Sequence, residues 1–61
     1  MAWKIEIRKG KSEKEPFYFV IKAGNGEIVA QSETYVAKAS AKSTAESIIK
    51  NAGSATIVDV A

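Results

Sequence analysis

Residues 17–31 read Phe-Tyr-Phe-Val-Ile-Lys-Ala-Gly-Asn-Gly-Glu-Ile-Val-Ala-Gln, and this stretch decides the fold. Two segments rich in β-branched and aromatic residues flank Asn25-Gly26, and this dipeptide is the strongest short-range signal for a β-hairpin. A type I′ turn requires a positive φ at both central residues, which Asn and Gly tolerate best. We therefore predict a hairpin with a two-residue loop at Asn25 and Gly26.

A two-residue loop would also set the register of the two strands. The predicted pairs are Gly24 with Glu27, Ala23 with Ile28, Lys22 with Val29 and Ile21 with Ala30. Because side chains alternate across a strand, each face takes every second residue. The predicted core face carries Phe19, Ile21, Ala23, Ile28 and Ala30, and the mixed outer face carries Tyr18, Val20, Lys22, Val29 and Gln31.

The segment before the hairpin alternates strictly between apolar and charged residues. Trp3, Ile5 and Ile7 alternate with charged side chains, which predicts a half-buried strand over residues 3–8 with these three side chains inward. Residues 9–16 break the pattern with Gly10 and Pro16, and we interpret them as a solvated connection. Three consecutive strands of this kind predict an antiparallel meander.

The pattern changes to a helical period from about Ala37. Apolar residues then recur on one helical face, at Ala41, Ala45, Ile48, Ile49 and Ala52. Glu46 and Lys50 have the spacing of a surface ion pair, and Gly53 suits a left-handed helix end. Residues 55–60 are rich in β-branched residues and predict a last strand. The order is β-β-β-α-β, a single α+β domain over residues 1–61.

The chain is small and lacks the usual covalent supports. It has 61 residues, no Cys and no His, so it has neither a disulfide nor the usual zinc ligands. A domain of this size buries only about 60% of its unfolded surface and is marginal alone. Oligomerisation is the remaining support. The last strand could fold back onto its own meander, which would leave a four-stranded sheet with exposed edges, or reach the sheet of a neighbouring copy. The small size favours the second arrangement, so we expect a homodimer with Ile57, Val58 and Val60 at the interface.

Motifs for catalysis or cofactor binding are weak or missing. Gly10-Lys11-Ser12 resembles the end of a phosphate-binding loop, but Ile5 stands where that motif needs a further Gly. Glu13 and Glu15 lie in a charged loop rather than in a pocket. We therefore predict no catalytic residue, cofactor or metal. No signal peptide or membrane-spanning stretch is visible, so we expect a cytoplasmic protein without a membrane partner.

A second candidate function comes from the basic residues near the first loop. The chain carries a formal charge of +2, and Arg8, Lys9 and Lys11 precede the exposed-face aromatic Tyr18. Cations beside an aromatic residue are typical of surfaces that bind nucleic acid without sequence preference. Three acids interleave with these cations, so we rank a nucleic-acid partner below a solvated surface.

The quoted residues resemble the YegP-like family of small prokaryotic proteins, which contain a domain of unknown function. The similar stretches are residues 22–30, Ser32-Glu33, Tyr35, residues 38–41, Glu46-Ser47-Ile48, Lys50-Asn51-Ala52 and Ile57-Val58-Asp59. The resemblance implies a β(3)-α-β unit, present as a tandem repeat or homodimer, with one continuous sheet and swapped C-terminal strands. It brings no established activity.

The chain departs from the family pattern at several positions. The family tends to have Arg near Tyr18 and Val20, and a capping Ser where this chain has Ala37. The helix start is therefore expected to be weakly capped, unless Thr34 or Ser40 substitutes. Our expectation from the sequence is a non-enzymatic interaction or binding module acting as a homodimer, with a partner protein also expected. The alternative is a weak, sequence-tolerant nucleic-acid binder that uses Arg8, Lys9, Lys11 and Tyr18.

Overall fold

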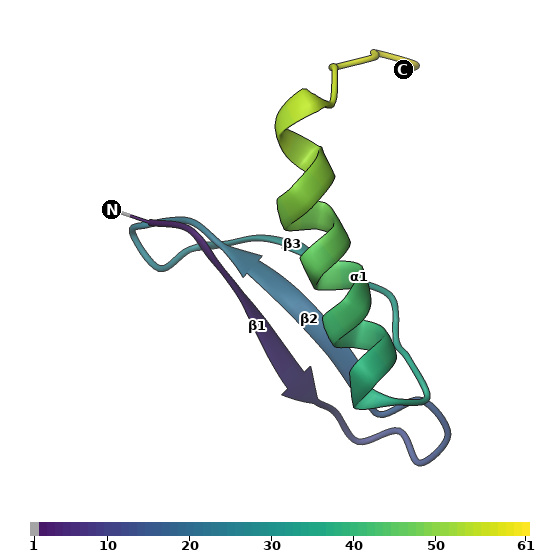
Figure 1. The fold of residues 1–61 in the computed structure, drawn as a ribbon. Helices are drawn as coiled ribbons and strands as arrows, with labels where there is room; N and C mark the ends of the chain where they lie inside the picture. Colours follow the sequence, from purple (N-terminus) through teal and green to yellow (C-terminus); the bar gives the residue numbers. More distant parts are fainter. Residues whose placement is uncertain (1) are drawn as a thin grey trace.

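The computed structural model describes residues 2–61 and contains three strands followed by a helix (Figure 1). Strands β1 (Lys4–Lys9), β2 (Phe17–Lys22) and β3 (Ile28–Gln31) form an antiparallel sheet in that order. Helix α1 (Lys38–Asn51) continues into a short 3-10 helix, η1 (Ala52–Ser54). The predicted α+β class, the meander and the helix are confirmed.

The loop between β2 and β3 differs from the predicted two-residue turn. The amide of Gly26 donates to the carbonyl of Ala23 at 2.9 Å, and the amide of Ala23 donates to the carbonyl of Glu27 at 2.9 Å. Within residues 2–61, Gly26 alone has a positive φ, at 89°. These features match a three-residue loop, a type I turn followed by a left-handed glycine. Asn25 keeps a negative φ, and its Oδ1 accepts the amide of Glu27 at 3.0 Å.

The longer loop changes the register next to it. Ile28 pairs with Lys22, and a register shift between Ile21 and Lys22 then restores the predicted pairing of Ile21 with Ala30. The predicted partners of Lys22 and Ile28 are therefore wrong. Because paired residues share a face, Ile28 lies on the face of Lys22, where 51% of its surface is exposed.

The core lies between α1 and the first two strands. Phe19, Ala41 and Ala45 are buried together, and the surrounding half-buried side chains are Ile5, Ile7, Phe17, Ile21, Tyr35 and Ile48. The ring of Tyr35 stacks on Phe19 with centroids 6.3 Å apart. Helix α1 contacts β1 and β2 but not β3, so Ala30 is exposed despite its predicted place in the core.

Val20 is fully buried although it lies on the sheet face opposite the helix. It sits in the central strand, directly across from Glu6 and Gln31. The half-buried side chains of Glu6, Arg8 and Lys22 share that face and are joined by ion pairs. We attribute the burial of Val20 to their aliphatic stems, which lie along apolar surface while their charged ends stay in water.

The ends of α1 are only weakly fixed by side chains. Ala37 occupies the N-cap position, and no side chain caps the helix, as expected from the sequence. At the other end, the predicted left-handed conformation of Gly53 is wrong, because η1 continues the chain with a negative φ there.

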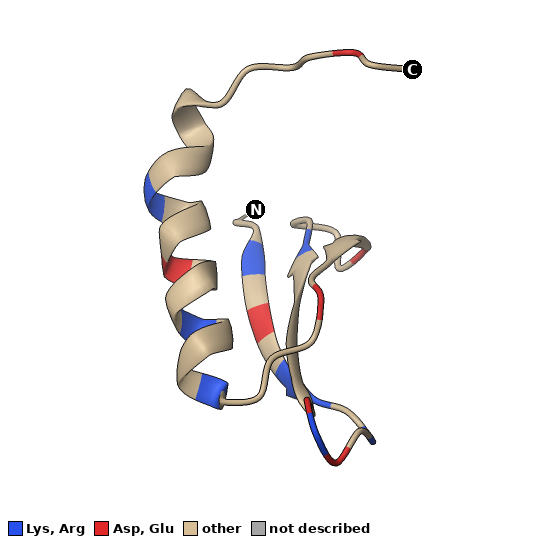
Figure 2. Cartoon of the chain, turned by 90° about the vertical axis from the view of Figure 1, so that its right-hand side faces the viewer, with Lys and Arg blue, Asp and Glu red and all other residues tan. Residues whose placement is uncertain are grey.

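Residues 55–61 form an extended tail rather than a strand of this chain. They have no ladder partner within residues 2–61, and every one of them is exposed. Figures 1 and 2 show the tail continuing beyond the end of the sheet after the last turn of the helix. The predicted fourth strand is therefore absent from the isolated chain, and its pairing with a second copy stays a prediction.

The hairpin loop supplies a direct test of the revised turn. Gly26→Ala places a side chain at φ 89° in open space, so the cost is backbone strain alone, about 1–2 kcal/mol of unfolding free energy. Gly53→Ala is the matched control, because it also meets open space but lacks a positive φ. Equal unfolding free energies of the two variants in urea would contradict the left-handed assignment.

Candidate interaction surfaces

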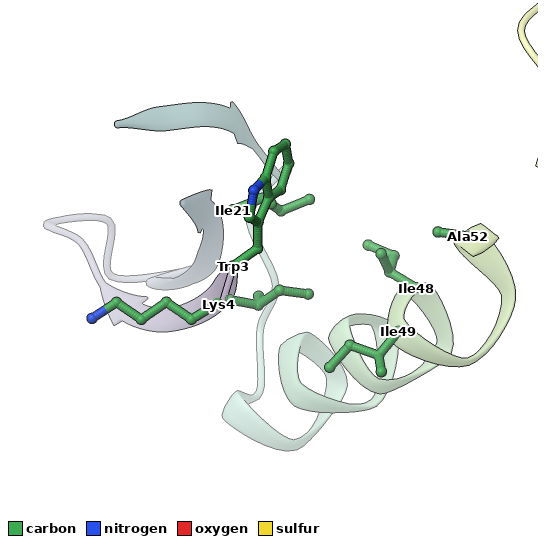
Figure 3. A pocket seen from close by; sticks show the side chains of 7 residues that line it. Trp3, Lys4, Ile21, Ile48, Ile49 and Ala52 are labelled. Atoms are coloured by element: carbon green, nitrogen blue, oxygen red, sulfur yellow. The ribbon is translucent and has the colours of Figure 1, made fainter. Parts of the chain in front are cut away.

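An apolar groove opens between the sheet and the end of α1. Its volume is about 210 Å³. Figure 3 shows Trp3 and Ile21 on the sheet side and Ile48, Ile49 and Ala52 on the helix side, while the Lys4 side chain points away. Its lining is thus almost wholly aliphatic and aromatic, which suits an apolar segment rather than a charged substrate.

Trp3 and Ile49 form the exposed walls of this groove. Trp3 is 63% exposed and Ile49 is 73% exposed. The sequence predicted Trp3 as an inward core residue, and this is wrong for the isolated chain. Trp3 does lie on the helix-facing side of the sheet, as its alternation with Lys4 requires, but α1 does not reach across to cover it.

The predicted interface residues all lie in the uncovered tail. Ile57 is 100% exposed, Val60 is 90% exposed and Val58 is 73% exposed. Three large apolar side chains within four residues are an unusual exposed feature for a monomer of this size. The tail and the groove are both uncovered apolar surfaces, and both adjoin the end of α1.

Charged residues gather on the outer face of the sheet, around Glu6. Its carboxylate lies 2.8 Å from Nη2 of Arg8, 3.5 Å from Nζ of Lys4 and 3.6 Å from Nζ of Lys22. Both Nη2 and Nε of Arg8 donate to Oε1 of Glu6, and the Nε bond is 3.2 Å long. Lys4 and Lys22 face each other directly across the strands, an unfavourable pairing that Glu6 offsets by binding both.

The cluster shifts the pKa values of two of its members. Hydrogen bonds from Arg8 hold the pKa of Glu6 below its usual value of 4.5, with Lys22 and Lys4 adding to the effect and partial desolvation opposing it. The pKa of Arg8 is raised, first by its hydrogen bonds to Glu6 and then by Tyr18, its direct cross-strand partner. Both side chains therefore stay charged throughout the neutral range.

The structure divides the four residues predicted as a binding surface. Arg8 and Tyr18 lie side by side on the outer face of the sheet. Lys9 does not join them, because its Nζ lies 5.9 Å from the ring centroid of Phe17, which packs on the helix side. Lys11 lies in the exposed loop after β1.

Two cations that the sequence did not single out, Lys4 and Lys22, complete the outer-face group. Lys4 and Lys22 approach Glu6 as closely as an ion pair requires. The alternation of β1 already places Lys4, Glu6 and Arg8 on one face, so part of this group was visible in the sequence.

The loop of residues 10–16 is a closed turn without features of a phosphate-binding loop. The amide of Gly10 donates to the carbonyl of Pro16 at 2.6 Å, and the Ser12 hydroxyl accepts the amide of Glu15 at 3.2 Å. β2 follows directly, so the helix that such a motif needs is missing. Oε2 of Glu15 accepts a hydrogen bond from the hydroxyl of Thr34 at 3.1 Å, and this bond connects the loop to the segment before α1.

The described part of the chain lacks two other kinds of site. Residues 2–61 hold no group of three His, Cys, Asp or Glu side chains placed to bind a metal. They also hold no helix with the length and apolar character needed to cross a membrane.

Comparison with known proteins gives a consistent assignment. Residues 12–59 match the family described as Domain of unknown function (DUF1508). The chain belongs to the DUF1508 family. It is 52% identical over 60 residues to a UPF0339 protein of Treponema denticola, covering 98% of this chain and 100% of that one. No solved structure gives a significant match.

Two other UPF0339 relatives are nearly twice as long as this chain. A UPF0339 protein of Acinetobacter baylyi is 56% identical over 51 residues, which cover 84% of this chain but 44% of that protein. The UPF0339 protein YegP of Shigella flexneri is 49% identical over 41 residues, covering 67% of this chain and 37% of YegP. The chain thus spans less than half the length of these two relatives. The resemblance to YegP-like proteins is confirmed.

The lowered pKa of Glu6 gives a prediction for the pH dependence of stability. A carboxylate whose pKa falls on folding stabilises the protein above its unfolded pKa and loses that contribution as the pH falls through the folded pKa. Glu6→Gln should therefore be less stable than the wild type at pH 7, and the difference should shrink below about pH 4.5.

Urea unfolding of both proteins at neutral and acidic pH measures this difference. The control is the same substitution in an Arg8→Gln background, where the main cause of the shift is gone and the effect of Glu6→Gln should be smaller. If the difference in unfolding free energy between the wild type and Glu6→Gln stays constant with pH, the ion pairs of Glu6 are not its cause.

Proposed function

We propose that this DUF1508 protein is a non-enzymatic interaction module that works as a homodimer. In the proposed dimer, residues 55–60 of each copy form a strand against the other copy and cover its apolar groove. The observation that carries the proposal is the uncovered apolar tail beside an uncovered apolar groove.

The small core supports the proposal energetically. Within residues 2–61, the buried side chains are Phe19, Val20, Ala41 and Ala45, two of which are alanines. Burying Ile57 or a tail valine would contribute about 1.5–3 kcal/mol each by apolar transfer. Covering the tail and the groove together therefore adds stability that a chain of this size otherwise lacks.

The position of the tail favours a partner's tail over the chain's own as the occupant of the groove. The tail continues past the end of the sheet (Figure 2). Ile57 within it is 100% exposed. β1 is an edge strand, and the groove is lined by Ile5 of β1 and by Trp3, which directly precedes it. The unpaired backbone edge of β1 is therefore next to the site that a fourth strand would occupy.

The lengths of the relatives agree with a paired unit. The Treponema denticola protein is matched over its whole length by one copy of this chain. The 41 residues matched in YegP of Shigella flexneri are 37% of its length, so YegP has about 111 residues and is long enough for two copies of the stretch that matches the family, residues 12–59. One relative thus has the length of a single unit, and another is long enough for two. These lengths support the association of two units.

The side chains on both surfaces are suited to binding rather than to catalysis. The chain has no Cys or His, and the groove is lined by apolar residues with no convergent polar groups. The names of the three relatives described above state no activity. We therefore assign function to surfaces that recognise partners.

Solution mass is the direct test of the dimer. Light scattering should give twice the chain mass of 6.5 kDa, and this value should persist on dilution to low micromolar concentration. Ile57→Asp should abolish the dimer by placing a charge in the interface. The emission of Trp3, the single tryptophan, should shift to longer wavelength in this variant because its groove becomes solvated.

Two further variants complete the test. Ile49→Asp changes the groove instead of the tail, and the solution mass should again fall from that of a dimer to that of a monomer. Val36→Asp is the matched control, because Val36 is 70% exposed but lines neither surface. A wild-type chain that scatters as a monomer, or an Ile57→Asp variant that keeps the dimer mass, would overturn the proposal.

A further inference from the structure

The outer face of the sheet is a second surface that the proposed dimer contacts do not use. α1 packs on the opposite face, and no other element of residues 2–61 covers the outer one. Three cations and one acid lie on it, namely Lys4, Arg8, Lys22 and Glu6, so the group has a net charge of +2. Figure 2 shows the alternation of basic and acidic residues along β1.

The three cations come from two cross-strand pairs, but their charged ends converge on Glu6. Lys4 pairs with Lys22 at one end of the face, and Arg8 pairs with Tyr18 at the other. The backbones of the two pairs are four residues apart along β1, roughly 13 Å in an extended strand, whereas the charged ends of Lys4, Lys22 and Arg8 all lie within 3.6 Å of the Glu6 carboxylate. The half-exposed ring of Tyr18 lies at the Arg8 end and rests beside Gly10.

Glu6 holds these cations in place without neutralising them. All three approach one carboxylate within 3.6 Å, so less side-chain freedom is lost when a ligand binds. Cations held beside an aromatic ring on an open sheet face are the elements with which proteins bind single-stranded nucleic acid, through phosphate contacts and base stacking.

We propose that the outer face binds single-stranded nucleic acid without strong sequence preference. Lys4, Lys22 and Arg8 contact the phosphates, and a base stacks on Tyr18. The proposal names the partner class for the interaction module, so it rests on that function, but each copy carries a complete outer face and dimer formation is not required. An acidic peptide would use the same cations but would gain nothing from the aromatic ring.

Binding of labelled single-stranded oligonucleotides of about 12 nucleotides, followed by fluorescence anisotropy at rising salt, tests the proposal. Three phosphate contacts should give a slope of log affinity against log salt of about −2 for single strands. Lys4→Gln with Arg8→Gln and Lys22→Gln should remove this slope. Lys4→Gln alone, at a side chain that is 65% exposed, should reduce it by about 0.7 if the triple variant unfolds.

The matched control removes three cations from the helix instead. Lys38→Gln with Lys42→Gln and Lys50→Gln changes the net charge equally and should leave the slope unchanged. Tyr18→Leu should weaken binding on the order of tenfold with little change in slope, because it removes stacking. Three results would overturn the proposal. They are a loss of oligonucleotide affinity in the helix variant equal to that in the outer-face variant, an affinity for polyglutamate equal to that for the oligonucleotide, and no binding at low salt. Solution mass, measured on the same samples, reports separately on the dimer.

Discussion

The packing of Phe19 against the small residues of α1 determines the shape of this protein. Ala41 and Ala45 are buried against Phe19 and allow the first half of the helix to approach β2 closely. One turn after Ala45, Ile48 and Ile49 replace alanine, and Trp3 lies across the groove from them on the sheet side. The interface is therefore closed at one end and open at the other, where the apolar groove lies.

The outer face follows from the same arrangement. A single helix covers one face of the sheet, so the central strand needs other cover on its second face. Val20 obtains it from long charged side chains whose ends meet at Glu6. The ion pairs are partly exposed and contribute little energy individually. Their main effect is to fix the position of the cations above a buried valine, which makes the outer face ordered as well as charged.

The sequence predicted the elements well because each has a strong local signal. Strict alternation identified β1, and the spacing of Ala41, Ala45 and Ile48 identified α1. The register near the hairpin was harder, because Gly24-Asn25-Gly26 supports either a two-residue or a three-residue loop, and local propensity does not choose between them. Alternation also placed Trp3 correctly on a face, but whether a helix reaches it depends on tertiary packing.

The candidate surfaces were predictable only in part, for a related reason. Arg8 and Tyr18 were identified, but Lys9 was grouped with them by sequence proximity although alternation places it on the opposite face. Lys22 joins Arg8 only through the pairing of β1 with β2, a contact between residues far apart in the chain.

The tail is the one segment whose strand propensity is not matched by a strand in the described residues 2–61. The β-branched composition of residues 55–60 predicted a strand, yet the isolated chain offers this segment no ladder. In the strands and the helix, local preference and structure agree. In residues 55–60 they conflict, because a segment with strong strand propensity has no strand to pair with. The proposed dimer would remove this conflict, because a second copy would supply the strand edge that the tail lacks. In that dimer the open groove beside Trp3 would be the other half of the same interface.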